Sequence, residues 1–289
     1  MRSWVNYHSH TNYCDGALPP VDYTLEAIRL GLPAYGYSSH APVDFETVWC
    51  MPRANLENYL SDVNAIREKY EKDLQVYLGL EIDYFPGIAK SRQNIIREIP
   101  LDYFIGSVHF VGSFDNGEPW NIDTSYELFQ RGIKEIYHSD IKKAAIRFWE
   151  LTRQMIEEYR PDVIGHIDKI KMHNAEGNFF HENEKWYKDQ VKLTIDLLKD
   201  CDCKVEINTR GYYKYQKTDL YPSDWIIDLL HKSDIPLMIS SDSHHPSEII
   251  KGMEYAASRL KALSINKIFA LYNHKWSEFE FNEEGILFS

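Results

Sequence analysis

Seven short apolar segments, rich in β-branched and aromatic residues, recur along this chain of 289 residues and constrain its fold most strongly. Their composition and length predict β-strands, at residues 4–9, 34–40, 74–83, 101–110, 162–168, 203–209 and 235–244. Between several of them, apolar residues recur at helical spacing, which predicts helices at 56–73, 141–161, 186–201 and 223–233. Ser223 is a suitable N-cap for the last of these helices.

The alternation of strand and helix predicts the fold class. A strand followed by a helix, repeated about seven times, is typical of α/β proteins with a parallel sheet and outer helices. At this length we expect a single domain, residues 1–289, that forms a closed or nearly closed β/α barrel resembling a TIM barrel. Two long loops after predicted strands, 111–126 and 172–186, are expected to shape the substrate pocket.

The composition excludes some classes of partner. The chain has 32 Lys and Arg against 44 Asp and Glu, which gives a formal net charge of −12. This charge disfavours binding to a nucleic acid polymer, and bound divalent cations would offset part of it. Because the chain has no signal-peptide pattern and no apolar run that approaches 18 residues, we expect a soluble, cytoplasmic protein without a membrane partner.

The four cysteines give little indication of function. They lie at positions 14, 50, 201 and 203, and none forms a CxxC pair with zinc-binding spacing. Their scatter predicts reduced thiols, as in a cytosolic protein. Cys201 and Cys203 resemble a metal-binding pair only weakly, and we interpret them as structural.

Nearly every predicted strand ends in a residue of a type that binds metal ions. The sixth strand differs, since it ends in Asn208 and Arg210. In a β/α barrel the C-terminal ends of the strands meet at one mouth, so these side chains are expected to converge there. The candidate ligands are His8, His10, Asp15, His40, Glu81, His109, His166, Asp242 and His244.

The spacing of two pairs supports this convergence. Residues i and i+2 of a strand share a face, so His8 with His10, and Asp242 with His244, can point into the same mouth. A single histidine near a strand end is more often a hydrogen-bonded polar residue than a ligand. All nine candidates together, however, would be costly to bury without partners, and metal ions are the simplest partners for them. The sequence therefore predicts a metal site.

Six motifs in this chain resemble those of the polymerase-and-histidinol-phosphatase (PHP) family. They are "HSHTNYCDG", "GYSSH", "GLEIDYFPG", "DYFIGSVHF", "GHID" and "SDSHHP", and they follow the family's order from about residue 6 to residue 260. Two of them, "GLEIDYFPG" and "DYFIGSVHF", are most similar to the monofunctional histidinol phosphatases of histidine biosynthesis.

The resemblance implies a distorted seven-stranded barrel that holds three divalent metal ions. His8, His10, Glu81 and Asp242 would hold the first ion, and Glu81 would bridge to a second ion held by His109 and His166. The third ion would be held by Asp15, His40 and His244. Some family members have histidine where Asp15 stands, so the choice among zinc, manganese and iron stays open.

The resemblance also implies hydrolysis of L-histidinol phosphate to L-histidinol and phosphate. In such a site two ions lower the pKa of a shared water, and the third helps to neutralise the phosphate oxygens. Asp242 or His244 is the candidate that protonates the leaving alkoxide.

Basic residues near the strand ends are candidates for binding the phosphate. Arg210 is the first of these substrate-binding candidates, Lys171 the second and Arg53 a weaker third. Glu206 or Asp83 could accept hydrogen bonds from the amine or imidazole of histidinol.

Three other functions remain open from the sequence. The same chemistry could act on another small phosphomonoester, such as phosphotyrosine or a nucleotide. A PHP module could bind metal without turnover. An amidohydrolase-type deaminase also begins with an HxH motif on a barrel strand, but the order of the later ligands fits that family poorly. The oligomeric state is not predicted.

Overall fold

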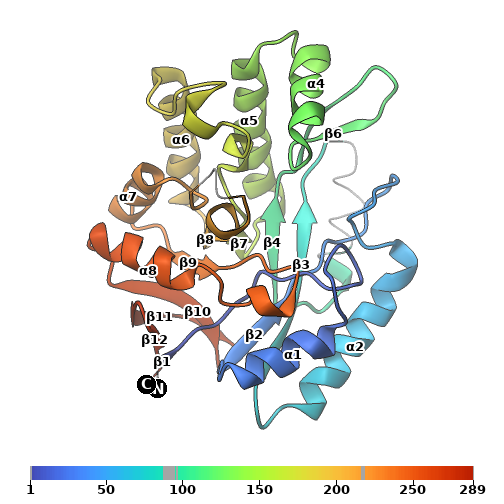
Figure 1. The fold of residues 1–289 in the computed structure, drawn as a ribbon, viewed down its shortest axis with the longest axis vertical. Coiled ribbons are helices and arrows are strands. Elements are labelled where there is room, and N and C mark those ends of the chain that lie inside the picture. Colours follow the sequence, from blue (N-terminus) through green and yellow to red (C-terminus); the bar gives the residue numbers. More distant parts are fainter. Residues whose placement is uncertain (1, 87–94, 96, 216–218, 289) are drawn as a thin grey trace.

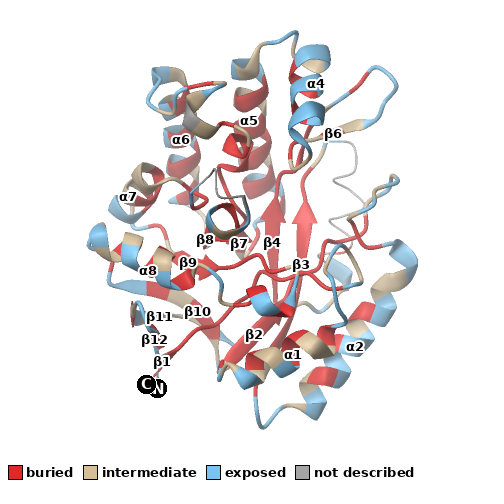
Figure 2. Ribbon diagram, viewed as in Figure 1, coloured by how far each residue is buried: buried red, intermediate tan, exposed pale blue. Residues whose placement is uncertain are grey.

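A curled parallel sheet of six strands forms the centre of the computed structural model, which describes residues 2–86, 95, 97–215 and 219–288. Helices surround this sheet (Figure 1), and its strands are almost entirely buried (Figure 2), as is typical of parallel sheets. The predicted α/β class is therefore confirmed. In spatial order the strands are β2 (Ala34–Tyr37), β3 (Gln75–Asp83), β4 (Tyr103–Ser107), β7 (Val163–Ile164), β8 (Lys204–Asn208) and β9 (Leu237–Ser240).

The helices pack their apolar sides on the sheet. In α2 (Leu56–Lys69), for example, the buried residues Tyr59, Val63 and Ile66 recur at helical spacing. The four predicted helices correspond to α2, α5 (Ile141–Tyr159), α6 (Lys185–Leu198) and α7 (Asp224–Lys232), and Ser223 is the N-cap of α7. The sequence did not individually predict α1 (Pro20–Arg29), α4 (Tyr126–Ile136) or α8 (Met253–Ala262).

Residues 4–9, predicted as the first strand, form isolated bridges instead of a regular strand. Asn6 bridges to Tyr35 and Ser9 bridges to Ser243, so the segment lies between β2 and the residues that follow β9. The Asn6 side chain bonds to the backbone of His8, accepting from its N–H at 3.3 Å and donating to its carbonyl oxygen at 3.1 Å. A side chain that bonds to the nearby backbone competes with the ladder of a strand. The predicted count of seven strands is not confirmed.

Two antiparallel sheets lie outside the central one. The chain ends pair through β1 (Arg2–Ser3) and β12 (Gly285–Leu287), and the termini are neighbours in Figure 1. This sheet continues through β11 (Lys275–Asn282) to β10 (Lys267–Tyr272). The predicted loop 111–126 contains a hairpin of β5 (Phe110–Ser113) and β6 (Pro119–Asn121).

Tyr103 joins the N-terminal segment to the sheet through hydrogen bonds of its hydroxyl group. Its hydroxyl lies 2.6 Å from the carbonyl oxygen of Tyr7 and 3.0 Å from that of Tyr37, within the buried core. Two glycines make room for this ring: a Cβ added at Gly36 would lie 2.5 Å from the Tyr103 hydroxyl, and one at Gly79 would lie 2.6 Å from Cζ. The position of His8, next to Tyr7, therefore depends on this contact.

Gly79→Ala is expected to destabilise the protein by roughly 1–3 kcal/mol, which is typical of an overpacked core. The added methyl group would push Tyr103 away from the two carbonyl groups that it joins. Urea denaturation followed by fluorescence measures the change. A variant that unfolds at the same urea concentration as the wild type would contradict this account of the core.

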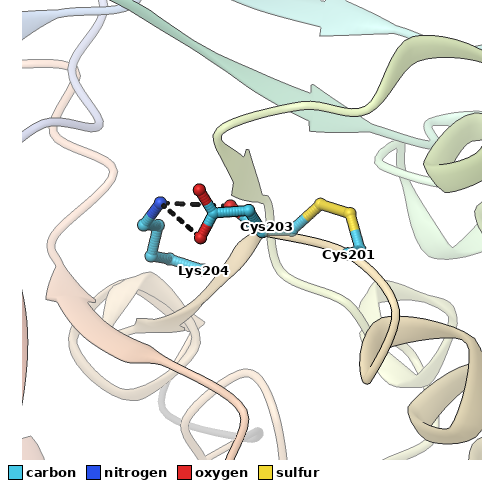
Figure 3. The surroundings of a disulfide bond; sticks show 4 residues. Cys201, Cys203 and Lys204 are labelled. Atoms are coloured by element: carbon cyan, nitrogen blue, oxygen red, sulfur yellow. Dashed lines mark hydrogen bonds and ion pairs between the residues drawn. A yellow bond between two sulfur atoms is a disulfide. The ribbon is translucent and has the colours of Figure 1, made fainter.

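Cys201 and Cys203 are joined by a disulfide bond (Figure 3), so the prediction of reduced thiols is wrong for this pair. The turn between α6 and β8 brings their Cα atoms to 5.3 Å, a usual separation for a disulfide. Figure 3 also shows Lys204, whose ammonium group donates to the backbone oxygen of Asp202 at 3.1 Å. Within the described part of the chain, Cys14 and Cys50 form no disulfide bond.

Among the helices of the described residues, none has both the length and the apolar character needed to cross a bilayer.

Candidate metal centre

The candidate ligands lie at the C-terminal ends of the central strands, where the fold brings them together. Glu81 lies near the C-terminal end of β3. His109 lies two residues after the end of β4, and His166 and Asp242 lie two residues after the ends of β7 and β9, respectively. Seven of the nine candidates are buried. Asp15 and His244 are more open, with side chains 30% and 17% exposed, and they form the outer side of the cluster.

Glu81 lies at the centre of the cluster. Its Oε2 is 3.2 Å from His8 Nε2, 3.1 Å from His40 Nδ1 and 3.5 Å from His10 Nε2. Its Oε1 is 3.1 Å from His166 Nε2 and accepts a hydrogen bond from Ser107 at 2.5 Å. One buried carboxylate therefore lies within 3.5 Å of four imidazoles, and His109 Nε2 lies 3.8 Å from its Oε1.

Two further carboxylates complete the cluster. Asp242 Oδ1 lies 3.2 Å from His10 Nε2 and 3.7 Å from His8 Nε2. Asp15 lies 3.2 Å from His244 Nε2 through Oδ2, and 3.7 Å from His10 Nδ1 through Oδ1. These contacts bring together all three acidic candidates.

The donor atoms fit divalent metal ions. Five buried atoms of the cluster face one another and make no hydrogen bond within the described part of the chain: His8 Nε2, His10 Nε2, His40 Nδ1, Glu81 Oε2 and Asp242 Oδ1. Buried polar atoms without partners are rare, and a cation would satisfy these five. Their nitrogen and oxygen donors suit zinc, manganese or iron.

Ligand atoms gather within 4.8 Å of one another in four overlapping groups. The groups share residues, and they add Asp83 to the predicted candidates. The groups are His10, Asp15, His40 and His244; His8, His10 and Asp242; His8, Glu81 and His166; and His40, Asp83 and His109.

The protonation states of Glu81 and His40 suit metal binding. Burial alone would raise the pKa of Glu81, but the imidazoles of His40 and His8 hold it well below its ordinary value. Burial lowers the pKa of His40 to about 4, so this imidazole is neutral at pH 7. Metal ions need ionised carboxylates and neutral imidazoles as ligands.

Two buried carboxylates orient candidate histidine ligands through contacts with their Nδ1 atoms. Glu206 Oε2 lies 2.7 Å from His8 Nδ1, and Asp83 Oδ1 lies 2.6 Å from His109 Nδ1. Each contact leaves Nε2 of the ring directed toward Glu81, as is common in metal sites. Glu206 also accepts bonds from the His166 N–H and the Ser240 hydroxyl, so it is a positioning residue and not the histidinol acceptor suggested by the sequence.

Glu206→Gln is expected to weaken metal binding about 10- to 100-fold, because an amide holds His8 in its ligand orientation less firmly than a carboxylate. Titration of the stripped variant with zinc, followed by calorimetry, measures this affinity. An affinity equal to that of the wild type would show that Glu206 does not support the site.

The metal cluster lines a pocket of about 230 Å³ together with four other residues. Arg210, at the end of β8, was predicted from the sequence. The other three, Trp49, Asn121 and Asp123, were not predicted as site residues. Asn121 and Asp123 come from the predicted loop 111–126, which therefore does shape this pocket.

Lys171 and the loop 172–186 are not among the residues that line the metal pocket. The Lys171 ammonium is 2.8 Å from Asp168 Oδ2 and donates to the Leu220 carbonyl at 2.9 Å. A short 3₁₀ turn at Lys169–Lys171 redirects the chain after His166, so Lys171 and the loop line a separate pocket of about 700 Å³. Arg53 is exposed and lies 3.3 Å from Asp44. Neither basic residue is among those that line the metal pocket.

This curled sheet and its cluster of imidazoles and carboxylates define an α/β protein with a cluster suited to divalent metal binding. The model of the PHP domain matches residues 6–210, and the chain belongs to the PHP family.

Comparison with known proteins points to one group within this family. The probable histidinol-phosphatase of Deinococcus radiodurans is 27% identical over 256 residues, which cover 86% of this chain and 89% of that protein. The histidinol-phosphatase of Bacillus subtilis is 24% identical over 86% of this chain and 96% of its own length. A solved structure of a Listeria monocytogenes protein, named as a candidate histidinol phosphatase, has a TM-score of 0.77 and 26% identity, covering 87% of this chain and 99% of that one.

Proposed function

We propose that this protein is a metal-dependent phosphatase that hydrolyses L-histidinol phosphate to L-histidinol and phosphate. The observation that carries the proposal is the buried cluster around Glu81, in a chain similar over most of its length to proteins named histidinol-phosphatases. The net charge of −12 favours a small phosphate ester over a nucleic acid polymer. We also propose that residues 4–9 act as the seventh strand of a distorted barrel and that the protein works in the cytoplasm.

The cluster would hold three divalent ions of zinc, manganese or iron. His8, His10, Glu81 and Asp242 would hold one, and Asp15, His40 and His244 another. Glu81, His109 and His166 would hold the remaining ion, with Asp83 beside them. Such ions supply a water of lowered pKa and neutralise charge on the phosphate oxygens. The protein contributes ionised carboxylates and a buried site in which these charges act strongly.

The proton for the leaving alkoxide is proposed to come from a water beside His244, since the ring itself, with Nε2 toward an ion and Nδ1 toward the Asp242 carbonyl oxygen, has none to give. Asp242 was the other candidate, but the His8 and His10 imidazoles outweigh its burial and hold its pKa well below the ordinary value. An ionised carboxylate has no proton to give. His244 lines the pocket, and its Nδ1 lies 3.0 Å from the Asp242 carbonyl oxygen, which fixes the ring.

Arg210 is the proposed phosphate-binding residue. Its guanidinium lines the pocket, where it donates to the Asp242 carbonyl oxygen at 2.9 Å and lies 3.5 Å from Glu248. These contacts hold it beside Asp242 and His244, and a guanidinium matches the geometry of phosphate oxygens.

Arg210→Met is expected to lower kcat/KM about 10- to 100-fold, because it removes charged hydrogen bonds to phosphate. Steady-state phosphate release measures the loss, and Arg53→Met on the exposed surface is the matched control. Equal losses in the two variants would contradict the role of Arg210.

A substrate panel tests the proposed function. Metal-loaded protein is assayed with L-histidinol phosphate, phosphotyrosine, a nucleotide monophosphate and a sugar phosphate. The proposal predicts a kcat/KM for L-histidinol phosphate about a thousandfold above the others, or some 4 kcal/mol of transition-state discrimination. A flat profile, or a preference for phosphotyrosine or the nucleotide, would refute it.

A further inference from the structure

Trp49 forms an aromatic side of the metal pocket. Its ring centroid lies 4.5 Å from that of His40 and 5.3 Å from that of His109. It stacks on Phe110 with centroids 5.4 Å apart and planes 20° from parallel. The indole is thus held beside two metal-ligand candidates and lines the pocket.

Asp123 supplies a carboxylate to the same pocket. Its side chain is 28% exposed, and its backbone N–H donates to Asn121 Oδ1 at 2.7 Å, which fixes the turn after β6. Lys169 Nζ lies 2.8 Å from Asp123 Oδ2. Burial raises the pKa of Asp123, but Lys169 and His109 lower it more, to about 2, so the carboxylate is ionised at neutral pH.

These two residues and Arg210 border different parts of the metal cluster. Arg210 bonds to the backbone of Asp242, whereas Trp49 packs on His40 and His109. A phosphate held near Arg210 would leave the ester alcohol on the side of His109, where Trp49 packs on the imidazole and Asp123 is close enough for His109 to lower its pKa. An aromatic face and a carboxylate together attract a cation.

We propose that Trp49 and Asp123 form a leaving-group subsite that selects phosphate esters whose alcohol carries a cationic group. This inference rests on the proposed phosphatase activity, and it names the residues that give the activity its substrate class. A pocket of about 230 Å³ is smaller than a typical drug-sized site, which favours a small amino alcohol. The alcohol part of L-histidinol phosphate, with an ammonium group and an imidazole, has this chemistry.

The test compares two esters in wild type, Asp123→Asn and Asp115→Asn. L-Histidinol phosphate has a cationic leaving group, and phenyl phosphate has none. The matched control Asp115 is exposed at the tip of the β5–β6 hairpin. In Asp123→Asn the ratio of kcat/KM for the two esters is expected to fall at least about tenfold, while Asp115→Asn keeps the wild-type ratio.

Inhibition by L-histidinol gives a second measurement. Its inhibition constant is expected to rise about tenfold in Asp123→Asn, since the carboxylate would no longer attract the ammonium group. If Asp123 only partners Lys169, both esters should slow in parallel and the ratio should stay constant, which would overturn the inference. Trp49→Leu provides an independent test if Asp123→Asn folds poorly, and an unchanged ratio in Trp49→Leu would also overturn it.

The outcomes separate this inference from the proposed function. A wild type that prefers L-histidinol phosphate, with variants that keep the same ratio, contradicts the subsite alone. A wild type that prefers another cationic ester, such as ethanolamine phosphate, and loses that preference in Asp123→Asn supports the subsite and contradicts the proposed substrate.

Discussion

Glu81→Gln is expected to lower kcat/KM for L-histidinol phosphate by on the order of 10³-fold, equivalent to the several kcal/mol that metal ions supply. The change keeps the shape of the side chain but removes its charge and places an NH₂ group against the imidazoles. Both Glu81 oxygens face histidine nitrogens at 3.1–3.5 Å, so no rotation of the amide avoids this mismatch. Phosphate release measures the loss, and elemental analysis shows the fall in bound metal.

The control for this variant is Glu68→Gln, an exposed position on α2. It should keep the activity and metal content of the wild type. Glu81→Gln protein that holds its full metal complement and retains activity within about tenfold of the wild type would contradict the central place given to Glu81.

Removal of metal by a chelator is expected to lower the melting temperature by on the order of 10 °C. Ions present at a thousandfold their Kd stabilise a fold by about 4 kcal/mol, and each kcal/mol corresponds to roughly 2–4 °C in a chain of this size. Without ions, the buried carboxylates Glu81 and Asp242 face one another across imidazoles with unsatisfied donor atoms. Calorimetric scans with and without chelator measure the shift.

Readdition of zinc or manganese should restore the melting temperature. The shift should be much smaller in Glu81→Gln, because that variant has lost part of the site. A melting temperature that does not change with chelator in the wild type would contradict the assignment of the cluster to metal ions.

The sequence predicted the ligand cluster because parallel strands end at the same edge of a sheet, and Glu81, His109 and His166 lie at or just after strand ends. His8 with His10, and Asp242 with His244, also lie in the cluster, although neither pair lies within a regular strand. The structure brings all nine predicted ligand residues into overlapping groups. Asp83 was considered only as a substrate acceptor, although the pair Glu81 and Asp83 has the same i, i+2 spacing.

The sequence did not predict features that depend on the paths of loops and turns. Trp49 and Asp123 reach the pocket through segments whose course no strand pattern fixes. Lys171 follows His166 closely in the sequence, but the 3₁₀ turn at Lys169–Lys171 directs it to another pocket. Cys201 and Cys203 meet because of the turn before β8. The first predicted strand fails as a regular strand because Asn6 bonds to its own backbone.

The measurement that tests the central claim most directly is a metal titration of stripped protein, followed by phosphate release from L-histidinol phosphate. The account predicts no activity without metal and a rise in proportion to bound ion until the cluster is filled. Full activity in the stripped protein, or none after the ions have bound, would contradict the claim that the cluster around Glu81 hydrolyses this ester.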